Sequence, residues 1–359
     1  MRVNLFSNIK EMPTLHIVNA NFESELEGRV AFDLEYSFGS SPILLQLQFL
    51  PCLYAPKEDG VGVSMLCAGS KLPLHLLCDP KSLPYTHIES WGYSQMIARW
   101  AKKRGITYNM PAWDVVKEVN SKAFSFTHSP QLANSMLITS EEEAKKWIAS
   151  FEGEKVFKSC FGVSGKGHLR IPQDSDKLEA FLRREFSKGL PVIAEPWVQR
   201  TLDFSTQWMI HLSGKIELLG TTICLSDERG QYRGNQTGDL DLLFGKNRRL
   251  VEKHMEIAEP ILQKIGKMGF FGNVGIDAML YDNDVLHPML EINARKTMGW
   301  FCIEMQKRYF PKQRVAVSYG KNSKQENLLP HEVSKRNGDV LRFSTRLSLN
   351  GNHNGYTEN

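Results

Sequence analysis

The segment GNVGIDAMLYDNDVLHPMLEINAR, residues 272–295, decides the fold. Its pattern predicts two β-strands joined by the turn-rich residues DNDV. Asp277 lies on the first strand, whereas Glu291 and Asn293 share one face of the second, because side chains alternate along a strand. A tight hairpin can place Asp277 opposite them. Two carboxylates and an amide oxygen in an apolar sheet are costly unless a cation lies between them, and Mg²⁺ prefers such oxygen ligands.

Two other interpretations of this hairpin remain open. The acidic side chains could face solvent, although the apolar neighbours of Glu291 favour an inward orientation. Arg295 could form a structural ion pair with Glu291 instead of contacting a substrate.

A glycine-rich segment, KSCFGVSGKGHLR at residues 158–170, precedes the hairpin and is predicted to be strand, turn and strand. Its glycines let backbone N–H groups approach an anion, and Lys158 and Lys166 add positive charge. The spacing matches neither the P-loop nor the G-x-G-x-x-G dinucleotide fingerprint. A plain glycine-rich turn remains the alternative. The three glycines are Gly162, Gly165 and Gly167.

A third segment, AEPWVQRTLDF at residues 194–204, ends an apolar strand. The strand end from Glu195 to Val198 offers backbone N–H and C=O groups to an adenine edge, and Asp203 could accept from ribose hydroxyls. By itself this signal is weak.

The composition is that of an ordinary globular protein, with 42% hydrophobic and 23% charged residues among 359. From Lys312 onward the chain has eight Lys and Arg residues and four acidic residues, which accounts for the net charge of +4. The rest of the chain is close to neutral and does not indicate a dedicated nucleic-acid surface. The six cysteines contain no C-x-x-C pair, so we expect reduced thiols in the cytosol rather than zinc or disulfides. We also expect neither a signal peptide nor a membrane span.

Taken together and in this order, these segments resemble the ATP-grasp superfamily over roughly residues 115–305. The resemblance implies a mixed α+β and α/β chain, in which two α+β subdomains sandwich ATP after a small Rossmann-like pre-ATP-grasp domain. The implied domains are residues 1–115, then 116–310, divided at residue 200 into a glycine-loop subdomain and a metal-site subdomain. Residues 311–359 are expected to be a polar, basic and mobile tail.

The resemblance also assigns roles to individual residues. Lys122 and Lys158 correspond to the family's phosphate-contacting lysines, although Lys122 also suits an ordinary helix. Arg295 is similar to an arginine that orients the acyl substrate, so Arg295 and Lys158 are the expected catalytic residues. The remaining matches are Gly162, Ser164, Gly165 and Gly167 for the phosphate-covering loop; Glu195 with the backbone of Trp197 and Val198 for the adenine hinge; Asp203 for the ribose contact; and Asp277, Glu291 and Asn293 for Mg²⁺, with Mn²⁺ as an alternative.

The implied activity is that of an ATP-dependent ligase, which converts a carboxylate to an acyl-phosphate and joins it to an amine. One departure is Gly275, which stands where D-alanine ligases have an arginine, so Arg295 or Lys296 would have to supply that charge. Arg233, in the loop at residues 230–238, could read a substrate carboxylate, or could lie in an exposed turn.

Two other functions remain open, namely an ATP-grasp kinase and an inactive ATP-binding regulator. We expect small-molecule carboxylate and amine substrates, and no nucleic-acid or membrane partner. The oligomeric state is left open, although members of the superfamily are often homodimers.

Overall fold

The computed structural model describes residues 13–28, 34, 41–79, 81–162, 167–171, 176–227, 232–320, 327–334 and 338–351. The chain divides into two units. The first comprises Met1–Phe22, Val30–Met110 and Leu329–Ser344; the second comprises Glu23–Arg29, Pro111–Leu328 and Thr345–Asn359. Each unit therefore takes in a segment that is distant in the chain from its main body.

The first unit contains a four-stranded parallel sheet with the order β3-β2-β1-β4. Strand β2 is buried at every position, as expected when both faces of a parallel sheet are covered. The strands are β1 (Thr14–Ile17), β2 (Gly60–Val63), β3 (Leu74–Leu76) and β4 (His87–Ser90); the helices are α2 (Pro42–Leu47), α3 (Pro51–Tyr54) and α4 (Gln95–Lys102); and β15 (Glu332–Ser334) pairs with β16 (Val340–Arg342). Helix α1 (Phe22–Leu26) crosses from the first unit into the second.

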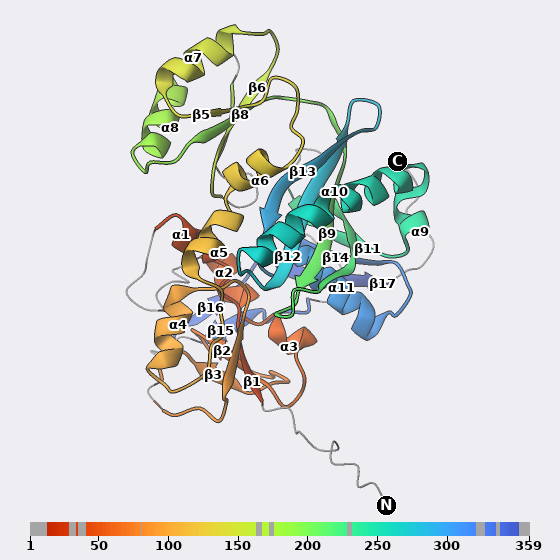
Figure 1. The fold of residues 1–359 in the computed structure, drawn as a ribbon. Helices are drawn as coiled ribbons and strands as arrows, with labels where there is room; N and C mark the ends of the chain where they lie inside the picture. Colours follow the sequence, from red (N-terminus) through yellow and green to blue (C-terminus); the bar gives the residue numbers. More distant parts are fainter. Residues whose placement is uncertain are drawn as a thin grey trace, which may run out of the picture. The chain divides into compact units, whose positions relative to one another are not determined.

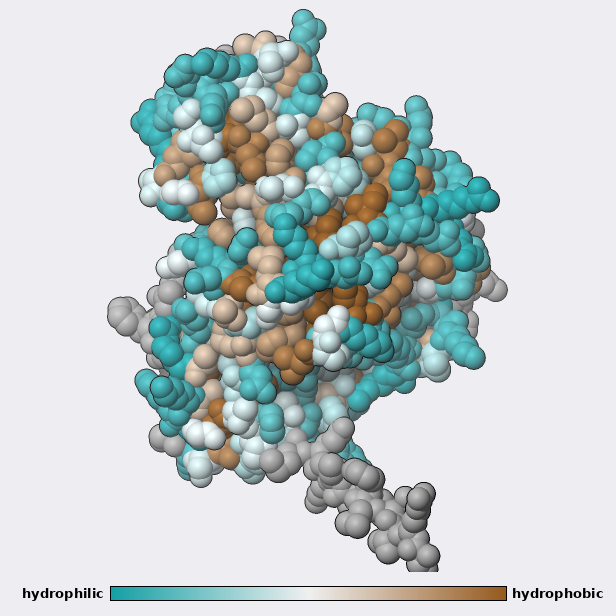
Figure 2. Space-filling view, viewed as in Figure 1, coloured by the Kyte–Doolittle hydropathy of each residue, from teal (hydrophilic) through white to brown (hydrophobic). Residues whose placement is uncertain are grey.

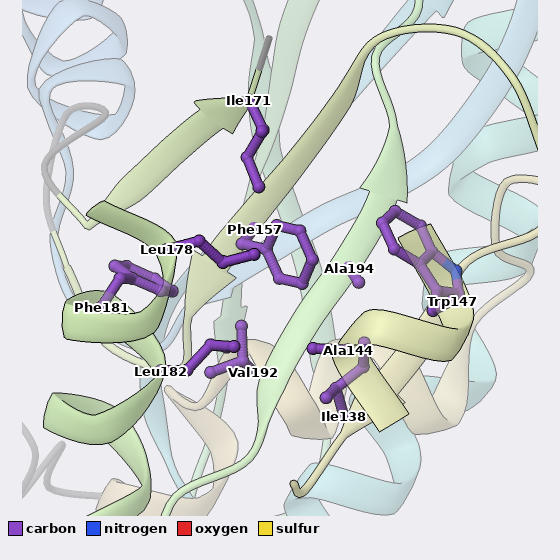
Figure 3. Close-up of a cluster of buried hydrophobic side chains, with 10 residues drawn as sticks. All are labelled: Ile138, Ala144, Trp147, Phe157, Ile171, Leu178, Phe181, Leu182, Val192 and Ala194. Carbon is purple, nitrogen blue, oxygen red and sulfur yellow. The ribbon is translucent and has the colours of Figure 1, made fainter. Parts of the chain in front are cut away.

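The smaller sheet of the second unit has the order β5-β8-β6-β7 and is antiparallel. Figure 3 shows how Phe157 and Ala194 on this sheet point toward Trp147 and Leu182 on its covering helices. Those helices are hydrophilic on their outer side (Figure 2). The elements are β5 (Met136–Ile138), β6 (Lys155–Ser159), β7 (His168–Ile171), β8 (Val192–Pro196), α7 (Glu141–Ala149) and α8 (Asp176–Phe186).

The larger sheet of the second unit has seven strands in the order β13-β12-β9-β10-β11-β14-β17 (Figure 1). Helices α10 and α11 both pack against it. The strands are β9 (Arg200–Ile210), β10 (Ile216–Ser226), β11 (Tyr232–Thr237), β12 (Gly272–Tyr281), β13 (Val285–Asn293), β14 (Val315–Gly320) and β17 (Arg346–Gly351); the helices are α5 (Trp113–Val119), α6 (Lys122–His128), α9 (Leu240–Phe244), the 3-10 turn Gly245–Asn247, α10 (Arg248–Lys267) and α11 (Met298–Tyr309).

A chain of hydrogen bonds joins α10 to strands β9 and β13. Nδ1 of His254 donates to the Pro288 carbonyl at 2.7 Å, because a carbonyl can only accept. Nε2 therefore accepts from the Thr206 hydroxyl at 2.8 Å, and that hydroxyl accepts in turn from the Trp208 indole at 2.8 Å. These bonds fix β13 at Pro288, shortly before Glu291 in the same strand.

The expectation of a tail at residues 311–359 needs correction. The described residues of this segment include four strands, two of which extend the large sheet. Val315, Val317 and Leu347 are almost completely buried there, so alternating apolar residues within a polar composition are enough to form sheet strands. The first unit also takes residues Leu329–Ser344, and its main body ends at Met110 rather than at the expected residue 115.

Candidate functional site

The three predicted metal ligands lie together on the hairpin of β12 and β13. Asp277 and Glu291 are partners in the strand register, and Asn293 is the partner of Gly275. Nδ2 of Asn293 donates to Oδ2 of Asp277 at 3.0 Å, which orients Oδ1 of Asn293 away from that bond. Two carboxylates and one amide oxygen are thus available to one cation.

The electrostatics of the two acids fit a cation between them. Burial, together with the charge of Glu291, raises the pKa of Asp277 to about 7. Burial also favours the neutral form of Glu291, but Lys122 and Arg295 outweigh that effect and lower its pKa to about 2. Burial and mutual repulsion thus oppose ionisation of both carboxylates together, and an added positive charge between them would offset that cost.

A cation bound at this hairpin would need further ligands from outside the protein. No group of three or more His, Cys, Asp or Glu side chains suited to a metal occurs among the described residues. The third protein donor here is an amide, and such sparse oxygen sites suit Mg²⁺ that takes its other ligands from phosphates and water.

Lys122 connects the glycine-rich segment to this hairpin. It is the first residue of α6, which Ser121 caps, and its ammonium forms an ion pair with Glu291. The same Nζ donates to the Gly162 carbonyl at 3.3 Å, and the Lys122 N–H donates to the Cys160 carbonyl at 2.9 Å. The structure thus places Lys122 between the start of the glycine loop and the carboxylates.

Lys158 and Glu195 form a second ion pair, on the face of the smaller sheet opposite its apolar core. Phe157 and Ala194 point into the core, so alternation turns the next residues, Lys158 and Glu195, to the other side. Each of the paired side chains is only 7% exposed. A buried pair of this kind is costly to desolvate, and an incoming phosphate would offer Lys158 an alternative partner.

Only the two ends of the predicted phosphate-covering loop can be placed. Ser159 N–H donates to the Gly167 carbonyl at 2.9 Å, which ties the end of the loop to β6. Gly167 has a positive φ of 94°, and a Cβ there would lie 2.3 Å from the Ser159 hydroxyl. Gly162 is also described, whereas Ser164 and Gly165 lie outside the described residues.

The predicted adenine hinge is partly engaged within the protein. The Trp197 N–H donates to the Glu154 carbonyl at 2.8 Å, so a nucleobase contact would have to use Val198 or a carbonyl. The Trp197 ring lies beneath the Arg170 guanidinium, whose carbon is 4.4 Å from the ring centroid. Asp203, the predicted ribose contact, accepts from Arg200 at 3.3 Å.

The two candidates for the missing charge at Gly275 have different surroundings. Arg295 lines a cavity with Glu291, whereas the Lys296 ammonium lies 4.7 Å from the centroid of the Trp300 ring. The reason for Gly275 is steric, because a Cβ there would lie 2.8 Å from Cγ2 of Thr297.

Arg233 is not brought to this group of residues. It lies on β11 and forms an ion pair with Asp227 at 2.5 Å, with 48% of its side chain exposed. It lines neither of the two cavities beside the predicted ligands. The substrate role predicted for Arg233 therefore remains a hypothesis that these contacts do not support.

The two cavities share Lys122 as a wall. One has an empty volume of about 210 Å³ and includes Lys158 and Glu195 in its lining. The other has an empty volume of about 260 Å³ and includes Glu291 and Arg295 in its lining.

The structure adds three residues that the sequence did not single out. Glu23 lines the second cavity, and His168 is the register partner of Lys158 on β7. His287, on β13, is buried, and neither of its ring nitrogens has a hydrogen-bond partner among the described residues. Only His168 had a signal in the sequence, since a hairpin around the glycine loop places it opposite Lys158.

Comparisons with known proteins bear on the fold of the chain. No family model matches the chain. A 190-residue stretch, 50% of this chain and 43% of the relative, is 33% identical to a [butirosin acyl-carrier protein]–L-glutamate ligase of Niallia circulans. The chain therefore matches less than half of the length of that relative.

Solved structures of biotin carboxylases have the same fold at low sequence identity. The enzyme from Campylobacter jejuni superposes with a TM-score of 0.50 at 15% identity, over 69% of this chain and 62% of that one. The biotin carboxylase domain of 2-oxoglutarate carboxylase from Hydrogenobacter thermophilus gives a TM-score of 0.53 at 13% identity, over 87% and 75%. The chain has the ATP-grasp fold. The predicted fold class is thereby confirmed, with the two sheets of the second unit as the ATP-grasp subdomains and the parallel sheet as the Rossmann-like module.

No helix among the described residues is both long and apolar enough to cross a membrane.

Proposed function

We propose that this chain is an ATP-dependent ligase that activates a carboxylate as an acyl-phosphate and joins it to an amine. The observation that carries the proposal is the ion pair of Lys122 with Glu291, beside Asn293 and Asp277. Lys122 offers a positive charge suited to phosphate, and it lines one cavity together with Glu291, Asn293 and Arg295. ATP and Mg²⁺, with Mn²⁺ as an alternative ion, are the cofactors that we propose.

The comparisons support the choice of ligands and substrates. The solved relatives were determined with a β-γ-ATP in one case and with magnesium ADP, ADP and bicarbonate in the other. The sequence relative is named for joining L-glutamate to an acyl-carrier protein. L-Glutamate and other small carboxylates are accordingly the first substrates to test.

A homodimer is the oligomeric state that we propose.

Nucleotide binding would exchange partners within the two ion pairs. Lys122 would move from Glu291 to a phosphate, and Lys158 would move in the same way from Glu195, so that neither ammonium is left unpaired. Bound Mg²⁺, held by Asp277, Glu291 and Asn293, would neutralise charge on the phosphates. Glu291, released by Lys122, would then be paired with the bound Mg²⁺.

The proposed chemistry has two balanced steps. An oxygen of the substrate carboxylate attacks the γ-phosphorus of ATP, the bond to the bridging oxygen breaks, and ADP leaves. The amine then attacks the carbonyl carbon of the acyl-phosphate, inorganic phosphate leaves, and the nitrogen loses a proton. Arg295 would hold the carboxylate oxygens in the first step and stabilise the charge that develops on them.

ADP release, measured with pools of amino acids, dipeptides and other carboxylates, tests the proposal, and mass spectrometry identifies the product. Chelation of Mg²⁺ should stop the release. Glu291→Gln should abolish it while thermal unfolding stays close to wild type, and Glu259→Gln, at an exposed residue of α10, is the matched control. Normal turnover by Glu291→Gln would show that the metal assignment is wrong.

A further inference from the structure

Arg295 is held by a carboxylate from a distant part of the chain. Nε of Arg295 donates to Oε1 of Glu23 at 2.6 Å, across 272 residues, and a second guanidinium nitrogen, Nη2, contacts the same oxygen. The two side chains are only 13% and 12% exposed. The structural ion pair that the sequence offered for Arg295 thus exists, but with Glu23 instead of Glu291.

This pair lies in the cavity in which the proposed chemistry would occur. Glu23 and Arg295 line it together with Lys122, Glu291 and Asn293. Arg295 also acts electrostatically on the proposed metal ligands, because its charge opposes the rise in the pKa of Asp277 and contributes to the low pKa of Glu291. A carboxylate bound at Arg295 would therefore lie beside two of the residues proposed to hold Mg²⁺, Glu291 and Asn293.

Charge balance limits what can bind there. Two cations, Lys122 and Arg295, are paired with two anions, Glu291 and Glu23. A substrate carboxylate that takes Arg295 would compete with Glu23 and leave this poorly exposed carboxylate without a full partner, which is costly. A substrate that carries its own ammonium group would restore the partner that Glu23 loses.

We infer that the acid activated in this cavity is an α-amino acid, whose carboxylate binds Arg295 and whose ammonium binds Glu23; this inference rests on the proposed ligase function. One carbon separates the two charges of an α-amino acid, so both can meet an arginine and a carboxylate that are in direct contact. An acid of the same length without the amine would satisfy only Arg295. Glu23 would thus determine the substrate class.

Trapping the activated acid with hydroxylamine tests the inference without knowledge of the natural amine. Hydroxylamine attacks the acyl-phosphate, phosphate leaves, and the hydroxamate is measured with ferric iron. The matched acids are L-glutamate and glutarate, L-aspartate and succinate, and L-alanine and propionate. For the preferred pair we expect kcat/KM to be at least about 100-fold higher for the amino acid, less than the discrimination of fully buried polar sites because this pair is partly exposed.

Substitution of Glu23 separates recognition from a structural role. In Glu23→Gln, no carboxylate loses its partner when an acid without an amine binds Arg295, so kcat/KM for that acid should rise. The variant also lacks the charge that binds the ammonium, so kcat/KM for the amino acid should fall. The preference should shrink to about 10-fold or less. Glu118→Gln, at an exposed position of α5, should keep the wild-type preference. A purely structural role of Glu23 would lower both values together.

Three results would overturn the inference. If wild type forms hydroxamate equally well from both members of every pair, the zwitterion is not required, and the ligase function stands without it. If Glu23→Gln keeps the wild-type preference, Glu23 does not read the ammonium; Glu23→Asp provides the same test if the glutamine variant does not fold. If no acid of either kind yields hydroxamate or ADP, the proposed function fails, and this inference fails with it.

Discussion

Replacement of His254 by asparagine should remove part of the acid sensitivity of the protein's stability. His254 has no exposed surface, and both of its ring nitrogens are engaged, one with the Pro288 carbonyl and one with the Thr206 hydroxyl. Burial lowers the pKa of His254 to about 4, against the favourable contact of the protonated ring with the Pro288 carbonyl. The folded protein therefore keeps this histidine neutral well below neutral pH.

The magnitude follows from the difference between the folded and unfolded states. An unfolded histidine has a pKa of about 6.5, so as the pH falls the unfolded chain takes up a proton that the folded chain does not. The stabilisation is present above about pH 6.5 and is lost as the pH falls toward about 4. At about 1.4 kcal/mol per pKa unit, the loss is about 3 kcal/mol over that range and about 2 kcal/mol between pH 7 and pH 5.

Urea denaturation of wild type and His254→Asn at pH 7 and pH 5 measures this loss. Asparagine keeps an N–H for the Pro288 carbonyl but does not titrate, while the other titrating groups are present in both proteins and cancel. Circular dichroism and tryptophan fluorescence must report the same transition for the comparison to hold. Wild type should lose about 2 kcal/mol more than the variant on acidification. An equal loss in both proteins would refute the reasoning, and His331→Asn, at an exposed histidine, should behave as wild type.

Two further predictions concern the site. Lys122→Ala should lower kcat/KM for ADP release by about 100-fold or more, because it removes the proposed phosphate contact and the ion pair with Glu291; a change of less than 3-fold would contradict its proposed role. Gly275→Ala should destabilise the fold by about 1–3 kcal/mol, since its Cβ would lie 2.8 Å from Cγ2 of Thr297. Thermal unfolding measures this loss, and Gly266→Ala in α10, where the new Cβ would make an ordinary 3.4 Å contact, is the control that should not be destabilised.

Local patterns in the sequence determined the hairpin and the pairing of its two acidic residues. Asp277 and Glu291 became register partners because a short turn joins two strands with alternating side chains, and this pairing involves only neighbouring segments. The side chain of Ser140, which caps α7, and the apolar face of α10 likewise depend only on spacings of a few residues.

Only the tertiary structure decided which distant side chains meet at that hairpin. Lys122 forms an ion pair with Glu291, and Glu23 forms one with Arg295. Both pairs result from the packing of segments that no periodicity in the sequence connects. The strand Val315–Gly320 was missed because polar residues dominate its surroundings, while sheet pairing depends on the neighbouring strands that the fold supplies. The sequence by itself thus determined the chemical groups of the site, and the packing of distant segments determined how those groups are paired.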